Sequence, residues 1–171
     1  ARDDTGTVNE DATLTVSNGD NPNVVAGASF VDSFSVSSQE TVPTGLAFNT
    51  DGTKMFVLGN SGDDVNEYTL TTGFDVSTAS FVDSFSVSSQ ETSPSGLAFN
   101  TDGTKMFVSG DNGDDVNEYT LSTGFDVSTA SFVDSFSVSS QETSPFGLSF
   151  NSDGTKMFLV GDTGNDVNAV S

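Results

Sequence analysis

The sequence contains no cysteine, no histidine and no tryptophan. The first two absences exclude disulfide bonds, thiol catalysis, Cys/His zinc sites and a histidine general base. Sugar-binding sites commonly stack the sugar on tryptophan or tyrosine. Because the sequence has no tryptophan, Tyr68 and Tyr119 are the only candidates for this role. No run of about 18 apolar residues is present, so the sequence predicts no membrane insertion.

Basic residues are also scarce. Arg2, Lys54, Lys105 and Lys156 stand against 25 acidic residues, and the net charge is -21. Nucleic acids and anionic membranes attract proteins through lysine and arginine, so this composition argues against either partner. Two interpretations of the acidity stay open: solubility in a salty medium, or carboxylates that hold Ca²⁺, which prefers oxygen ligands.

What the chain has is a 51-residue repeat. Residues 80–130 match residues 29–79 at 45 of 51 positions, and the 41 residues of 131–171 match the second copy at 31 positions. A repeat of this length that is rich in strand formers indicates a repeat architecture. The third copy ends in VNAVS, where an unchanged repeat would read VNEYT. Because terminal repeats meet a different neighbour, we expect this change to mark a natural end of the array.

Each repeat contains four strand candidates. In the first copy they are 45–48 (GLAF), 54–58 (KMFVL), 65–70 (VNEYTL) and 80–87 (SFVDSFSV). The first two flank Asn49-Thr50-Asp51-Gly52, a strong hairpin signal. The segment GFDVST at 73–78 reads as a connection, and helix periodicity is absent. Four short antiparallel strands in about 50 residues are typical of one β-propeller blade.

Two stretches resemble known families. The segment PxGLAFNTDGTKMFV, at 43–57 and 94–108 with a variant from Pro145 to Phe158, resembles the blade core of bacterial propellers of the NHL, TolB and YVTN kinds. Asp3 to Val16 resembles the start of cadherin-like or VCBS modules of giant secreted adhesins, and 12–16 within it reads as a short strand. We therefore expect residues 1–28 to be an extended arm or the remnant of such a module, followed by a propeller-like repeat domain at 29–171.

Counting strands leaves the array incomplete. Two blades are whole, 45–87 and 96–138, but the third has no fourth strand, and 29–36 reads as an outer strand without a blade. Closed propellers have about four to eight blades. The sequence therefore predicts an all-β fold of four-stranded antiparallel propeller-like blades, either as a fragment of a larger ring or completed by strand exchange with another chain. The expected partner is a further copy, in a homo-oligomer or a polymer.

Clusters of Asp, Asn and Gly at 59–64, 110–115 and 161–166 suggest calcium loops, with the alternative of plain turns in which glycine supplies a positive φ. The candidate ligands are Asp63, Asp64, Asp111, Asp114, Asp115, Asp162 and Asp166. At the N-terminus, the adhesin resemblance implies Ca²⁺ at Asp3, Asp4, Glu10 and Asp11, against the alternative of an acidic tail.

The polar segment SSQET leads into each inner strand, and propeller binding surfaces often lie on loops at one end of the ring. We interpret it either as a solvated connection or as a crown that binds a glycan or a cell-surface protein. The candidate residues are Gln39, Glu40, Gln90, Glu91, Gln141 and Glu142.

For function, the sequence predicts a non-catalytic structural or interaction module at the cell surface, outside the cell or on a virion. An adhesin, a surface layer, a filament or a phage fibre would be suitable settings. The alternative is a glycan- or protein-binding propeller. A propeller lactonase is a third hypothesis, disfavoured because near-identical blades repeat the same residues and histidine is absent.

Overall fold

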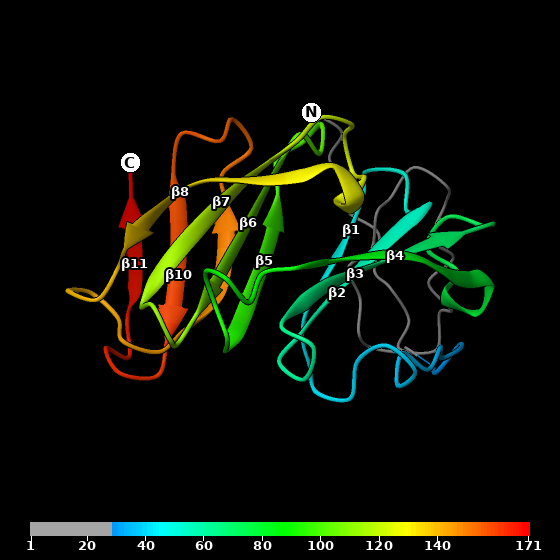
Figure 1. The fold of residues 1–171 in the computed structure, drawn as a ribbon, viewed down its shortest axis with the longest axis horizontal. Coiled ribbons are helices and arrows are strands. Elements are labelled where there is room, and N and C mark those ends of the chain that lie inside the picture. The colour runs from blue at the N-terminus through cyan, green and yellow to red at the C-terminus, as the bar shows by residue number, and fades with distance from the viewer. Residues whose placement is uncertain (1–28) are drawn as a thin grey trace, which may run out of the picture. The chain divides into compact units, whose positions relative to one another are not determined.

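The computed structural model describes residues 29–171, of which those from Asp32 onward form one compact unit. The expected N-terminal strand at 12–16 and the acidic residues before it lie outside the described residues. Within the unit, the strands form three antiparallel sheets that follow one another along the chain (Figure 1). Among the described residues no helix is long and apolar enough to span a bilayer.

The first two sheets have four strands each, in chain order. The first contains β1 (Pro43–Phe48), β2 (Lys54–Gly59), β3 (Asp64–Leu70) and β4 (Ala79–Ser86). The second contains β5 (Pro94–Phe99), β6 (Lys105–Gly110), β7 (Asp115–Leu121) and β8 (Ala130–Ser137). Single 3-10 turns, η1 (Val76–Thr78) and η2 (Val127–Thr129), precede β4 and β8. The predicted order of strands within a blade is confirmed, as is the hairpin at each Asp-Gly turn.

The third sheet has three strands, β9 (Pro145–Phe150), β10 (Met157–Gly161) and β11 (Val167–Val170), as the strand count predicts. Residues 29–36, predicted as an outer strand without a blade of its own, belong to no sheet within a single copy. A strand exists through its ladder of hydrogen bonds, and an outer strand needs a third strand beside it. The third strands of the first two blades, β3 and β7, already pair with β4 and β8, and within one copy β11 has no fourth strand beside it.

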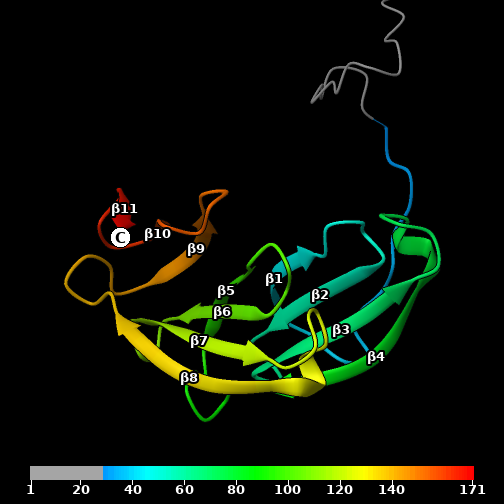
Figure 2. The same ribbon diagram turned by 90° about the horizontal axis from the view of Figure 1, so that it is seen from above.

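Adjacent sheets pack face to face through apolar side chains. Phe56, Leu58 and Val65 of the first sheet lie in one buried cluster with Leu97, Met106 and Val108 of the second. A smaller cluster joins the second sheet to the third, around Val116 and Leu159. The inner strands β1, β5 and β9 lie side by side at one margin of the sheets, and β4 and β8 lie at the other (Figure 2). This is the arrangement of consecutive propeller blades.

The Asp-Gly turn of each blade uses a glycine with positive φ, at Gly52, Gly103 and Gly154. In the second blade the ring of Phe125, which itself has φ of 58°, lies so close that a Cβ on Gly103 would overlap it. Beside Gly154 there is no atom within 4 Å of the position of a Cβ. The same turn is therefore constrained by backbone conformation in both blades and by packing in only one of these two.

This difference gives a matched pair of substitutions. Gly154→Ala should lower the free energy of unfolding by about 1–2 kcal/mol, the cost of a left-handed backbone in a residue with Cβ. Gly103→Ala should cost about 3 kcal/mol, because the Cβ also displaces the Phe125 ring. Urea unfolding with an unchanged m-value measures both. Equal losses would show that the Phe125 ring does not confine the turn.

Candidate functional site

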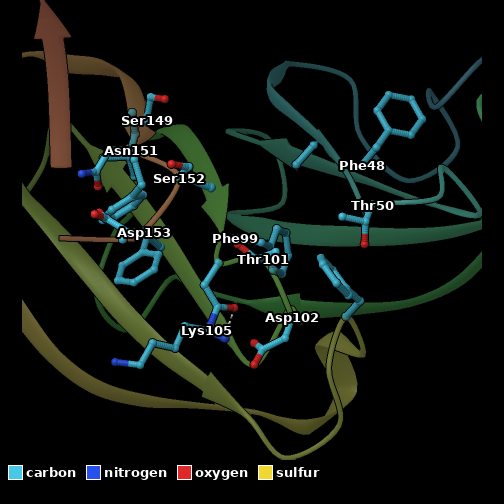
Figure 3. Close-up of a pocket in the computed structure, with 18 residues that line it drawn as sticks. Phe48, Thr50, Phe99, Thr101, Asp102, Lys105, Ser149, Asn151, Ser152 and Asp153 are labelled. Atoms are coloured by element: carbon cyan, nitrogen blue, oxygen red, sulfur yellow. Dashed lines mark hydrogen bonds between the residues drawn. The ribbon is translucent and has the colours of Figure 1, made fainter. Parts of the chain in front are cut away.

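A cleft of about 750 Å³ lies at the ends of the three inner strands. The Asp-Gly turns of the second and third blades form its rim, and phenylalanine rings form its floor. Figure 3 shows Asn151, Ser152 and Asp153 on one side, with Asp102 and Lys105 between them and the first blade. The other lining residues are Ala47, Phe48, Thr50, Ala98, Phe99, Asn100, Thr101, Phe107, Phe125, Leu148, Ser149, Phe150 and Gly154.

The two rim aspartates are held by their own turns. Oδ1 of Asp102 accepts hydrogen bonds from the Thr104 hydroxyl at 2.6 Å and the Thr104 amide at 3.0 Å. Asp153 does the same with Thr155. These bonds, the hydroxyl first and then the amide, lower the pKa of each aspartate. Both side chains are therefore fixed carboxylates at neutral pH, which suits binding hydroxyl groups or orienting a water.

The cleft also contains a lysine whose ammonium is accessible. Lys105 Nζ donates to Glu118 at 2.6 Å, and both side chains are partly exposed. The corresponding lysine of the first blade, Lys54, uses its ammonium in contacts inside the protein. Lys54 Nζ donates to the buried Glu67 at 2.6 Å and to the Phe125 carbonyl at 2.5 Å, and Glu67 also accepts from the Val127 amide. Repetition of the sequence therefore does not repeat the environment, because each copy has a different neighbour.

The aromatic floor is built between blades. Phe56 and Phe99 have ring centroids 4.5 Å apart, and Phe107 and Phe150 repeat this contact one blade further on. Phe125 completes the first group at 5.6 Å from Phe99. An apolar floor below a rim of carboxylates, amides, hydroxyls and one ammonium can take a ring with polar substituents. Sequence reasoning missed this cleft, because the Asp-Gly segments read as plain turns.

The predicted SSQET crown has a different structure. Glu40, Glu91 and Glu142 are buried, and each carboxylate accepts backbone N–H groups from its own blade. Glu91 accepts from Ser93 at 2.6 Å, Asn112 at 3.2 Å and Gly113 at 3.3 Å. The glutamates therefore tie each inner strand to the loop between the second and third strands. The three glutamines predicted as binding residues differ in their environments. Gln39 and Gln90 accept hydrogen bonds from the hydroxyls of Tyr68 and Tyr119, whereas Gln141 is exposed.

A glycine makes room for each of these carboxylates. A Cβ on Gly59, Gly110 or Gly161 would overlap the side chain of Glu40, Glu91 or Glu142. The signal was present in the sequence, since the glutamate and the glycine stand 19 residues apart in all three copies. Sequence reasoning missed the pairing because no local pattern links a loop to the end of a strand.

The calcium candidates are distributed over the three loops without converging. Asp64 and Asp115 each accept a hydrogen bond from an asparagine two residues later, at 2.6 and 2.7 Å, as Asp166 does at 2.9 Å. Burial raises the pKa of Asp64 and of Asp115. Asp111 accepts from Ser144, whereas Asp63, Asp114 and Asn165 occupy the positive-φ position, a role the sequence interpretation gave to glycine. Within residues 29–171 no three acidic side chains gather into a metal-binding group. Calcium binding, with Asp162 among the candidates, stays a prediction.

No protein-family model and no curated protein matches the sequence. Solved structures do. A protein from Bacteroides fragilis, named for an inferred 6-phosphogluconolactonase activity, matches with a TM-score of 0.58 at 15% identity, over 74% of this chain and 34% of its own. The periplasmic gluconolactonase of Pseudomonas aeruginosa matches at 0.54 and 16%, over 74% and 34%. The Cps50 (Swd1) β-propeller domain of Myceliophteria thermophila matches at 0.53 and 13%, over 74% and 39%.

These matches establish that the chain has a β-propeller-like fold built of repeated blades, as the sequence predicted. The chain spans about a third of the length of the proteins it matches. The narrower resemblances, to NHL, TolB or YVTN blades and to cadherin-like modules, are not among these findings.

The functional prediction is corrected. The sequence predicted a non-catalytic structural or binding module with roles in adhesion or filaments, whereas the first neighbours are named for 6-phosphogluconolactonase and gluconolactonase activities. The prediction that the chain is not an enzyme is corrected by the same finding. The physical error lay in expecting identical blades to offer only identical residues. The cleft combines different positions from successive copies, including Thr50, Lys105 and Asp153.

The buried glutamate predicts a stability effect. Glu91→Ala leaves three backbone N–H groups without their acceptor and should lower the free energy of unfolding by about 3 kcal/mol. The matched control is Thr92→Ala, which removes one exposed contact to Asn112 and should cost less than about 0.5 kcal/mol. Chemical denaturation measures both. Similar values for the two variants would contradict the anchoring role of Glu91.

The third blade predicts a pH effect. Burial raises the pKa of Glu142, but bonds from the amides of Gly164, Thr163 and Ser144 outweigh it and lower the pKa to about 2. Because this pKa is lower in the folded state than in the unfolded state, the ionised Glu142 contributes stability at pH values above the unfolded pKa. That stability is lost as the pH falls towards the folded pKa. The Tm of the native protein should therefore fall between about pH 5 and pH 2 more steeply than that of Glu142→Gln. Parallel curves would contradict this linkage.

Proposed function

We propose that this chain provides three blades of a β-propeller hydrolase that acts on neutral sugar lactones in the cleft at the ends of β1, β5 and β9. The observation that carries the proposal is the cleft itself, with carboxylates and an ammonium above an aromatic floor. Its volume is in the range of small-molecule sites. The names of the lactonase neighbours support the choice of reaction.

Lactone hydrolysis needs a water directed at the ring carbonyl and stabilisation of the negative charge that develops on the carbonyl oxygen. The water oxygen forms a bond to the carbonyl carbon, and the ring C–O bond then breaks to give a hydroxy acid. Asp102 and Asp153 are fixed carboxylates that can accept hydrogen bonds from the water and from ring hydroxyls. Lys105 has three N–H donors and uses one on Glu118, so its ammonium can face the carbonyl oxygen.

Charge favours a neutral substrate over a phosphorylated one. The net charge of -21 repels anions, and the ammonium of Lys105 is already paired with Glu118. Although two neighbours are named for a phosphorylated lactone, we therefore assign glucono-1,5-lactone as the better substrate. A location outside the cytoplasm, as for the periplasmic neighbour, and blades of the NHL, TolB or YVTN kind belong to the same proposal.

The test is the rate of acid release from glucono-1,5-lactone in a pH-stat, corrected for spontaneous hydrolysis. Asp102→Asn and Asp153→Asn should each lower kcat/KM at least tenfold, in line with the loss of a positioned charged group. Asp51→Asn is the matched control, since Asp51 makes the same turn with Thr53 but does not line the cleft. It should leave the rate unchanged. Phosphorylated lactone should be the poorer substrate.

A rate no higher than that of buffer would contradict the proposal. So would an equal loss in Asp51→Asn and Asp102→Asn, because the effect would then come from the turn and not from the cleft.

A further inference from the structure

Two sheet faces in the unit have no neighbouring sheet among the described residues, and both are apolar. The first belongs to the first blade, where Leu46 is 61% exposed while its counterpart Leu97 in the second blade is 9% exposed. A groove of about 430 Å³ lies on this face. It is lined by Ser33, Phe34, Val36, Pro43, Thr44, Gly45, Leu46, Met55, Val57 and Val76.

The second free face belongs to the third blade. Val167 is 72% exposed, whereas its counterparts Val65 and Val116 are 0% and 4% exposed. Val160 and Phe146 are also exposed on this blade. A soluble protein seldom leaves such residues uncovered in one contiguous set.

The two faces are the two halves of a contact that the chain already makes internally. Between the first and second blades, Leu58 and Val65 pack with Leu97, Met106 and Val108 in one buried cluster. Val160 and Val167 occupy the positions of Leu58 and Val65. The groove residues Leu46, Met55 and Val57 occupy the positions of Leu97, Met106 and Val108. The free face of the third blade therefore fits the free face of the first.

Substitutions in the third copy increase the apolar character of its free face. Thr44 and Ser95 donate a hydrogen bond to the carbonyl of the proline that begins the next blade, Pro94 and Pro145. Phe146 stands at this position in the third copy, so an aromatic ring replaces a hydroxyl where a following blade would begin. In the same copy Ala169 replaces Glu67 and Glu118, which removes a charge.

The segment before the first blade points to the same neighbour. Phe34 packs edge-on against Tyr68 with ring centroids 5.6 Å apart, and Phe85 packs against Tyr119 in the same way at 5.4 Å. Phe85 contacts the second blade from the end of β4, which belongs to the blade before it. By the same relation, the segment that contains Phe34 takes the place of the outer strand of a preceding blade. The sequence of residues 29–35, SFVDSFS, is identical to the sequences of β4 and β8 without their first residue.

We propose that the occupant of each free face is a second copy of this chain. Two copies then form a closed ring of six blades, in which the third blade of each packs on the first blade of the other. Residues 29–35 of one copy add to β11 of its partner as the missing fourth strand. Six blades lie within the common range for closed propellers, whereas a third copy would exceed it. The inference does not depend on the proposed hydrolase activity.

Charge works against this association and so provides a signature of it. Each copy has a net charge of -21, so like charges repel when two copies meet. Added salt screens that repulsion, and the buried contact is apolar. Salt should therefore strengthen the pair, which is the reverse of an association driven by opposite charges.

The first experiment is size-exclusion chromatography with light scattering on the whole chain. The expected mass is twice the 17.7 kDa of one chain, with the pair more stable at 0.5 M than at 0.05 M NaCl. Leu46→Asp and Val167→Asp each place a charge on one free face and should shift the protein to the monomer. An equimolar mixture of the two variants should recover a pair, since one of its two contacts has both faces intact. Val82→Asp is the control, at an exposed apolar site on β4 of a complete sheet, and this variant should remain a pair.

The second experiment tests the strand register. Asn117 lies opposite Ser135 between β7 and β8, so the proposal places Asn168 opposite Ser33 of the partner. The variant Asn168→Cys with Ser33→Cys should form a covalent dimer on oxidation, since the chain has no other cysteine. Asn168→Cys with Asp32→Cys, shifted by one residue, points one thiol to the other face and should give little dimer.

A stable monomer at both salt concentrations would overturn the proposal, as would an open series of higher polymers. Equal cross-linking in the two cysteine pairs would overturn the strand addition. Monomeric Leu46→Asp that keeps the native circular dichroism spectrum would separate loss of association from loss of folding.

Discussion

One buried carboxylate per blade determines how the rest of each repeat is arranged. Glu40, Glu91 and Glu142 each accept backbone amides from the start of the inner strand and from the loop after the second strand. Together with one backbone hydrogen bond, this contact holds together two segments about 20 residues apart at the end of the sheet ladder. The glycine that ends each second strand is required because the carboxylate lies against it. The three loops are therefore ordered by the same charge and not by the composition of each loop.

With the loops fixed, the blades differ only in their neighbours, and that difference generates both proposed functions of the surface. The lysine at the start of the second strand is committed to the next blade in one copy and available at a cleft in another. Val65 is buried between blades, whereas Val167 in the same position is exposed. A catalytic cleft and an association face can thus arise from near-identical repeats, because equivalent residues have different neighbours at each position in the array.

The strands and hairpins could be predicted from the sequence because their signals are local. Alternating apolar residues and the Asp-Gly turns define β1 and β2 to within two residues of their bounds. Residues 29–35 have the same sequence as residues 80–86 of β4, yet they form no strand within one copy, since the state of an edge segment depends on a partner strand and not on propensity. The positive φ of Asp63 also escaped prediction, because Gly62 beside it is the more permissive residue.

The site was harder to predict than the fold. Asp102 and Asp153 read correctly as turn residues, but their convergence on one cleft depends on the packing of three inner strands. The glutamates of SSQET suggested an exposed crown because the segment is polar. Their burial depends on amides from a loop that no periodicity connects to them. Contacts between distant segments, and not local preference, account for each of these differences.

The role of the buried carboxylate can be tested most directly by native-state hydrogen exchange. The amides of Asn112 and Gly113 belong to an exposed loop but donate to Glu91, so they should exchange slowly, and Glu91→Gln should accelerate both by tenfold or more. The neighbouring amide of Asp111, which donates to the Ser93 carbonyl, serves as an internal reference. Exchange of Asn112 and Gly113 at the rate of an open loop in the native protein would contradict the account.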